Sequence, residues 1–128
     1  EMIQFKGKIT DIREETHDVR TFTIESPTNL DFIPGQFCLV SFINSDNFKN
    51  QKKPFTFSSS PTQKGFIELT IKKLGSFTSA LFSLKVEDYL EVRGPFGRHL
   101  NFDESIKDDI VFIPFPVLGC CIIYDRDD

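Results

Sequence analysis

Apolar and polar residues alternate in several segments of the first 94 residues of this chain, and glycine or proline turns lie between segments of this kind. The pattern is clearest at residues 19–25 and 66–73. Because successive side chains of a strand point to opposite faces, strict alternation predicts β-strands with one buried face. Pro34-Gly35 and Lys64-Gly65 are strong turn signals between such strands. We therefore expect a fold built from antiparallel strands.

Six strands and a single helix are expected. The strands are predicted at residues 5–13, 19–25, 36–43, 53–59, 66–73 and 89–93, the last closed by a turn at residues 94–97. Ser76 or Thr78 is placed to cap the helix. Six short strands with one helix predict an all-β fold, a six-stranded antiparallel (Greek-key) barrel with one short α-helix. The apolar positions that recur at helical spacing are Phe77, Ala80, Leu81 and Leu84.

The pattern changes after residue 97. Residues 98–109 read as a polar linker, and residues 109–113 as a new buried strand that Pro114-Phe115-Pro116 stops abruptly. Residues 117–124 form a short apolar run before an aspartate-rich end. We expect one domain at residues 1–108 and a short remnant of a second domain at residues 109–128.

Charge and cysteine content narrow the function classes. The net charge of −4 disfavours nucleic acid as a main partner, although Lys49, Lys52 and Lys53 make a local basic patch. No apolar run is long enough for a membrane span. The 3 cysteines lack the spacing of a metal site, which predicts free thiols in a reducing cytoplasm. The 15 phenylalanines predict a Phe-rich core.

Two segments carry chemical information. The first, Lys53-Pro54-Phe55-Thr56-Phe57-Ser58-Ser59, places a cation, an aromatic ring and a hydroxyl along one strand. Since Lys53 and Phe55 are two residues apart, they project to the same side. The second, Gly75-Ser76-Phe77-Thr78, opens the predicted helix, where backbone N–H groups and the helix dipole favour an anion. Taken separately, Phe55 also fits a core position, and Ser76 and Thr78 also fit simple helix capping.

These segments resemble the flavin-binding barrel of the ferredoxin–NADP reductase-like oxidoreductase family. The strand motif of that family is Arg-x-Tyr-Ser/Thr-x-x-Ser, which residues 53–59 match with lysine and phenylalanine at the first and third positions. Residues 34–37, 69–74, 75–78 and 94–97 match four further motifs of the family in the same order. The resemblance covers residues 3 to about 113.

The resemblance implies a flavin site. Lys53 would hold a flavin phosphate, Phe55 would pack on the isoalloxazine ring, and Thr56 would face the nitrogen that accepts hydride, which makes Thr56 the catalytic candidate. Pro54, beside Lys53, is a further implied flavin contact. FAD is the implied cofactor, with FMN as an alternative, and NAD(P)H enters only through a missing domain or a partner. The remaining implied flavin contacts are Ser59, Thr70, Ile71, Lys72, Gly75, Ser76, Phe77 and Thr78.

The departures from the family pattern have consequences. Lysine lacks the bidentate fork of arginine, and phenylalanine lacks the tyrosine hydroxyl, so we expect flavin binding to be weaker by roughly 1–2 kcal/mol. Residues 109–113 resemble the first strand of the family's nicotinamide domain, but Pro114-Phe115-Pro116 replaces the glycine-rich turn that follows it. We therefore expect a truncated or frame-shifted reductase that binds flavin and is not efficiently reduced by nicotinamide nucleotides on its own.

The function implied is electron transfer between a nicotinamide nucleotide and an acceptor protein or small molecule, with a partner subunit as a further expectation. The alternative is a small β-barrel interaction module without redox activity, in which the same motifs only pack the barrel. A third reading, a barrel that binds single-stranded nucleic acid, is disfavoured by the acidic charge and by the absence of tryptophan. The choice between NADH and NADPH stays open.

Overall fold

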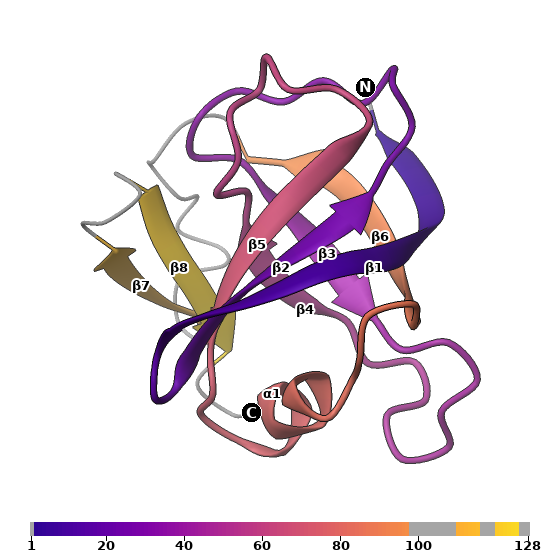
Figure 1. Ribbon diagram of the computed structural model, residues 1–128, viewed down its shortest axis with the longest axis vertical. Helices are drawn as coiled ribbons and strands as arrows, with labels where there is room; N and C mark the ends of the chain where they lie inside the picture. The colour runs from indigo at the N-terminus through magenta and orange to yellow at the C-terminus, as the bar shows by residue number, and fades with distance from the viewer. Residues whose placement is uncertain (1, 98–109, 116–119, 126–128) are drawn as a thin grey trace.

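Six antiparallel strands form a nearly closed barrel with one short helix at its end, in a computed structural model that describes residues 2–97, 110–115 and 120–125 (Figure 1). The strand order in the sheet is β4-β3-β6-β1-β2-β5. This confirms the predicted fold class. The barrel elements are β1 (Ile3–Thr16), β2 (Val19–Glu25), β3 (Phe37–Ser41), β4 (Lys53–Thr56), β5 (Phe66–Lys72), α1 (Ser76–Phe82) and β6 (Tyr89–Phe96).

The long strand β1 curves the sheet into a barrel. Its first half pairs with β6, whereas its second half pairs with β2. Gly7 lies next to this change of partner, and a Cβ atom at this position would lie 2.3 Å from Ile24 Cγ2 and 2.7 Å from the Glu25 carbonyl oxygen. Only glycine allows β1 and β2 to approach so closely there.

The barrel closes where the end of β4 meets β5, the two outer strands of the sheet. Phe57 forms an isolated β-bridge with Leu69, and the Ser58 N–H donates to the Glu68 carbonyl at 2.8 Å. Beyond this bridge, β4 and β5 share no continuous ladder. We call residues 56–59 and 68–70, which meet at this point, the seam of the barrel. Residues 56–59 belong to the predicted flavin motif.

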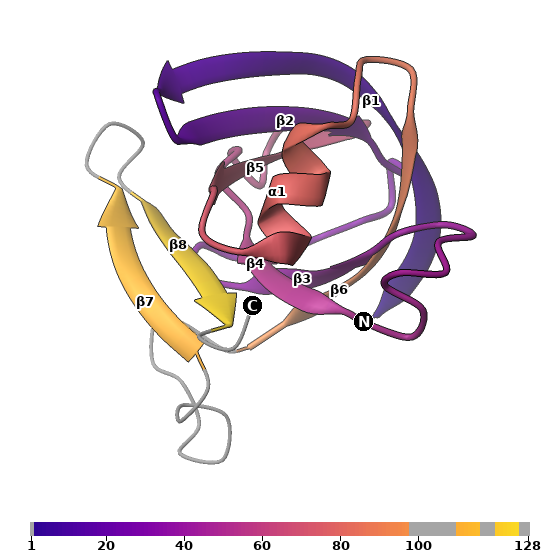
Figure 2. The same ribbon diagram turned by 90° about the horizontal axis from the view of Figure 1, so that it is seen from below.

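Helix α1 fills one end of the barrel, as Figure 2 shows. Phe77 and Leu81 are fully buried in the barrel core. Phe77 contacts the rings of Phe42 and Phe48 with centroid distances of 4.9 and 5.4 Å. The core is rich in phenylalanine, as predicted; its largest fully buried side chains include Phe22, Phe55 and Phe77.

Several element boundaries differ from the predictions. Strand β6 continues through Gly94-Pro95-Phe96, where a turn was expected, because Gly94 and Phe96 still pair with Ile3 and Phe37. The N-cap position of the helix is Gly75, and the predicted capping side chain is that of Thr78, which accepts the Gly75 N–H. The longer β6 comes from pairing partners that are distant in sequence.

The C-terminal segment forms a hairpin of β7 (Ile110–Phe115) and β8 (Cys120–Asp125). The prediction that a strand ends abruptly at Pro114 was wrong, since Pro114 lies inside β7 and pairs with Cys121. In a two-stranded sheet each strand has a free edge, which accommodates a residue without an N–H. Strand β8 lies beside β4, and residues 98–109 of the expected linker fall outside the described residues.

No helix among the described residues is both long and apolar enough to cross a membrane.

Candidate functional site

Strand β4 places alternate residues of the predicted flavin motif on opposite faces. Phe55 is opposite Cys38, which is buried in the core, and Phe55 itself is 1% exposed. Thr56 is opposite Phe37 and therefore faces the outer side of the barrel. The Phe55 ring thus packs with the core, and Thr56 presents its hydroxyl on the other side.

Thr56 has an unusual environment. Its side chain is 2% exposed, and its hydroxyl oxygen Oγ1 has no hydrogen-bond partner within the described part of the chain. A buried hydroxyl without a partner costs about 1–3 kcal/mol, so such groups are uncommon in folded proteins. The Thr56 hydroxyl is therefore available to a ligand that reaches the seam.

Lys53 and Pro54 begin β4. Lys53 is half-buried, pairs with Val40 and lies on the same face as Phe55, as predicted. Pro54 is buried opposite Leu39. Because β4 is an outer strand of the sheet, a residue without an N–H is tolerated there.

A chain of hydroxyl groups runs outward from the seam across β5 and β2. Thr70 Oγ1 lies 3.0 Å from Ser58 Oγ and 2.9 Å from Thr21 Oγ1. The Thr21 hydroxyl donates to Glu15 Oε2 at 2.7 Å, and the Arg13 Nε–H donates to the same oxygen at 2.9 Å. Thr21 and Thr70 are 0% and 2% exposed. We call Ser58, Thr70, Thr21 and Glu15 the hydroxyl chain.

Glu15 ends the hydroxyl chain as an anion at neutral pH. The hydrogen bond from Thr21, with the bond and the charge of Arg13, lowers the pKa of its carboxyl, although partial burial acts in the opposite direction. An ionised carboxylate only accepts hydrogen bonds. Glu15 therefore keeps the Thr21 hydroxyl proton directed toward itself.

The other predicted β5 and β4 contacts have structural partners. Ser59 Oγ accepts the Glu68 N–H at 3.0 Å, which helps to close the seam. Ile71 is 1% exposed and belongs to the core. The Lys72 ammonium lies 3.8 Å from Asp18 at the β1–β2 turn.

The segment that was predicted to bind phosphate caps the helix. Thr78 Oγ1 accepts the backbone N–H groups of Leu74 and Gly75 at 2.8 and 3.0 Å, and Thr78 is 1% exposed. Ser76 is exposed, whereas Phe77 is fully buried. Of this segment, the exposed Ser76 is open to a ligand, and the Thr78 hydroxyl is engaged in capping.

The predicted site residues thus divide into two groups. Thr56, with Ser58 and Thr70 of the hydroxyl chain, lies on the outer side of the seam, while Phe55, Ile71 and Phe77 lie in the core. Sequence reasoning missed Thr21 and Glu15, because alternation marks Thr21 only as an outward position of β2. Their link to Thr70 depends on the pairing of β2 with β5.

The three lysines of the predicted basic patch do not all line the same groove. Lys49 and Lys52 line a groove of about 520 Å³ between the β3–β4 connection and the starts of β1 and β6. Acidic side chains of the same groove, Asp46 and Glu91, offset their charge. Lys53 does not line this groove.

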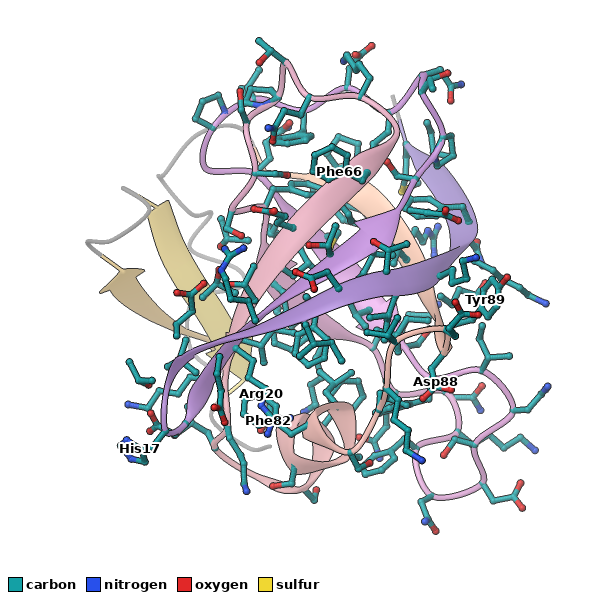
Figure 3. All side chains as sticks on the ribbon, viewed as in Figure 1. His17, Arg20, Phe66, Phe82, Asp88 and Tyr89 are labelled. Atoms are coloured by element: carbon teal, nitrogen blue, oxygen red, sulfur yellow. The ribbon has the colours of Figure 1, made fainter. Side chains whose placement is uncertain are left out.

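His17 lies at the tip of the β1–β2 turn, as Figure 3 shows, and its side chain is 92% exposed. It is 3.8 Å from Asp18, as expected for a solvated turn residue. His99, the second histidine, lies outside the described residues.

The sequence matches one family model and is similar to several curated proteins. A family model described as "Oxidoreductase FAD-binding domain" matches residues 6–100. A probable dihydroorotate dehydrogenase B (NAD(+)), electron transfer subunit, of Methanocaldococcus jannaschii is 32% identical over 106 residues, covering 83% of this chain and 35% of that protein. The sulfhydrogenase 1 subunit gamma of Pyrococcus furiosus is 34% identical over 102 residues, covering 77% of this chain and 33% of that protein.

Among solved structures, the ferredoxin reductase in carbazole 1,9a-dioxygenase superposes with a TM-score of 0.67 at 27% identity. The superposition covers 75% of this chain and 30% of that reductase. The chain therefore spans about a third of the length of the relatives it matches.

Proposed function

Because the chain belongs to the oxidoreductase FAD-binding domain family, we propose that its seam holds FAD with Thr56 at the reactive edge of the flavin. The observation that carries this assignment is the buried Thr56 hydroxyl, which has no hydrogen-bond partner among the described residues. A flavin ring edge carries nitrogen and oxygen acceptors, so it supplies the hydrogen bond that Thr56 lacks.

The other residues fit an FAD molecule that extends from the seam toward α1. Lys53 supplies a positive charge for the diphosphate, and Ser76 supplies an exposed hydroxyl at the start of α1. Thr70 and Ser58 provide polar groups beside Thr56. Phe55 remains a predicted ring contact, but its position in the core makes it a support for β4 in this structure.

Bound FAD supplies the capacity to accept hydride and to pass electrons on singly or in pairs. The protein contributes orientation and exclusion of water, since the Thr56 side chain is 2% exposed. The hydroxyl of Thr56 donates a hydrogen bond and moves no proton away from a substrate. Its role is therefore to position the flavin edge.

The full activity that we propose is electron transfer from a nicotinamide nucleotide to an acceptor. Two relatives are named as subunits of larger enzymes, which supports a partner subunit for this chain. NAD(P)H requires a further domain or a partner chain, and a cytoplasmic location fits such a role. Residues 109–128 remain a proposed remnant of a nicotinamide domain, and FMN remains a second possible cofactor.

Titration of the purified chain with FAD tests the proposal. We expect saturable binding, measured by quenching of flavin fluorescence, and a weaker affinity for Thr56→Val by about 5- to 10-fold, which corresponds to one hydrogen bond. Thr56→Ser keeps the hydroxyl and should bind like the natural chain. Lys53→Met should also weaken binding, because it removes the positive charge.

Thr28→Val, at an exposed threonine outside the site, is the matched control. If the natural chain does not bind FAD at all, the alternative of a β-barrel interaction module without redox activity is favoured. If FAD binds and Thr56→Val binds as tightly as Thr28→Val, the cofactor stands but its placement at the seam is wrong.

A further inference from the structure

The β7–β8 hairpin lies against the outside of the barrel at the seam. Strand β8 contacts β4 and β5, the two strands that meet there. Figures 1 and 2 show the hairpin beside these strands. It forms a two-stranded sheet of its own, so no ladder of backbone hydrogen bonds joins β8 to the barrel. Strand β8 therefore covers the seam without extending the barrel sheet.

This cover explains the burial of Thr56. The residue lies on the outer face of β4, an outer strand of the sheet, where a side chain is ordinarily open to solvent. It is nevertheless 2% exposed. Among the described elements, β3, β5 and β8 make the main contacts with β4, and β3 and β5 belong to the barrel wall. Strand β8 is therefore the described element that screens Thr56 from solvent.

The cover leaves the Thr56 hydroxyl unsatisfied. Its Oγ1 has no hydrogen-bond partner among the described residues. A buried hydroxyl without a partner costs free energy, so a ligand that displaces β8 and accepts a hydrogen bond from Thr56 recovers that cost. The place that FAD requires is thus held by a segment that fits it less well.

We propose that the hairpin is an autoinhibitory cover, which occupies the flavin position at the seam and is displaced when FAD binds. This inference rests on the proposed function. The strand pairs of the hairpin run from Ile110 with Asp125 to Phe115 with Cys120, so it can move as a unit without breaking a ladder of the barrel. FAD then replaces β8 as the group that shields Thr56 from water. Since FAD binds only uncovered molecules, its apparent dissociation constant is the intrinsic one divided by the uncovered fraction.

The double variant Ile122→Asn/Ile123→Asn tests the cover. Adjacent residues of a strand lie on opposite faces, so replacing both isoleucines makes each face of β8 more polar and weakens its packing on the barrel. Asparagine adds no charge that would act on the FAD phosphates. We expect the apparent dissociation constant for FAD, measured by flavin fluorescence titration, to fall about 3- to 10-fold, because the uncovered fraction rises. Ile122→Val/Ile123→Val keeps apolar, β-branched residues and is the matched control.

The thiols of β8 give a second measurement, on the natural chain. Cys120 and Cys121 belong to β8, whereas Cys38 is fully buried in the barrel core and is protected from reagents. A released hairpin is more accessible than one that lies against the barrel. The rate at which N-ethylmaleimide modifies Cys120 and Cys121, followed by mass spectrometry, should therefore increase several-fold when the chain is saturated with FAD.

The two measurements separate this inference from the proposed function. Equal FAD affinity in the asparagine and valine variants, or a modification rate that FAD leaves unchanged, would overturn the inference while the flavin site stands. Slower modification in the presence of FAD would overturn it as well, because β8 would then lie over the bound flavin. If neither the natural chain nor the asparagine variant binds FAD, the proposed function fails, and this inference fails with it.

Discussion

Thr78 shows how one side chain of the predicted site serves the fold. Its hydroxyl accepts two backbone N–H groups, those of Leu74 and Gly75, which precede the first turn of α1. Such groups have no partner inside the helix, so a side-chain acceptor stabilises the helix start. Gly75 is the N-cap and has no side chain to fill this role. Thr78, at the N3 position, supplies the side-chain acceptor instead, for the N–H groups of Gly75 and Leu74, as the N3 residue of a capping box does.

The resulting prediction concerns stability. Thr78→Ala should lower the free energy of unfolding by about 1–2 kcal/mol, measured by urea denaturation, because two backbone N–H groups at the helix start lose their acceptor. Thr78→Ser should retain most of the stability, and Ser79→Ala, at the exposed neighbouring position, serves as the control. Equal stability of Thr78→Ala and Ser79→Ala, with FAD affinity lost only in Thr78→Ala, would instead assign the hydroxyl to the ligand.

At the scale of the elements, β1 decides whether the strands close into a barrel. It is shared by two ladders, with β6 along its first half and with β2 along its second. The register with β2 shifts between Ile9 and Asp11, just after the change of partner. Such an irregularity increases the local twist and bends the strand. The close approach at Gly7 lies at this bend, so a single residue without a side chain permits the curvature.

Gly7→Ala therefore tests the bend. The added methyl group would lie 2.3 Å from Ile24 Cγ2 and 2.7 Å from a backbone oxygen, so β1 or β2 must move. We expect a loss of unfolding free energy of about 1–3 kcal/mol, measured by chemical denaturation. Lys6→Ala, at the exposed neighbouring position, should change the stability little. An unchanged stability of Gly7→Ala would contradict the packing described here.

At the scale of the whole molecule, ion pairs and hydrogen bonds hold carboxyl groups in several parts of the barrel. The Lys64 ammonium contacts Asp31, which lowers the pKa of that carboxyl, and the hydrogen bond from Thr16 is the main cause of the lowered pKa of Asp18. The pKa of Glu15 is also lowered, mainly by the hydrogen bond from Thr21. Three carboxyls in different loops and strands thus favour the folded state in their ionised form.

Acid should consequently destabilise the barrel. Since these pKa values are lower in the folded state, their contribution to stability is complete above the ordinary carboxyl values and is lost as the pH falls through the folded ones. We expect the unfolding temperature to be constant above about pH 5 and to decrease below about pH 4. In Glu15→Gln the decrease should be smaller, with the exposed residue Glu25→Gln as the control. A decrease in Glu15→Gln as steep as in the natural chain would contradict this role of Glu15.

Arg20 illustrates what the sequence does not reveal about the whole molecule. Its position in an alternating strand places it on the same face as the buried Phe22, where a charge is unexpected. In the structure its guanidinium donates to the Phe82 carbonyl at 2.8 Å and lies 4.6 Å from the centre of the Phe82 ring (Figure 3). The last turn of α1 thus provides a partner for Arg20, and this contact fixes the helix at the end of the barrel.

The sequence by itself determined the strands of the barrel, because alternation and turn residues are local properties that pairing only reinforces. It also placed β2 at its observed bounds and put Lys53, Phe55 and Thr56 on one strand. Which of these residues is open to a ligand was decided by the tertiary structure. The pairing with β3 turned Phe55 into the core and Thr56 to the outside, and the pairing of β2 with β5 joined Thr21 and Glu15 to Thr70. Burial and hydrogen-bond direction depend on partners that are distant in the chain, and no local pattern contains them.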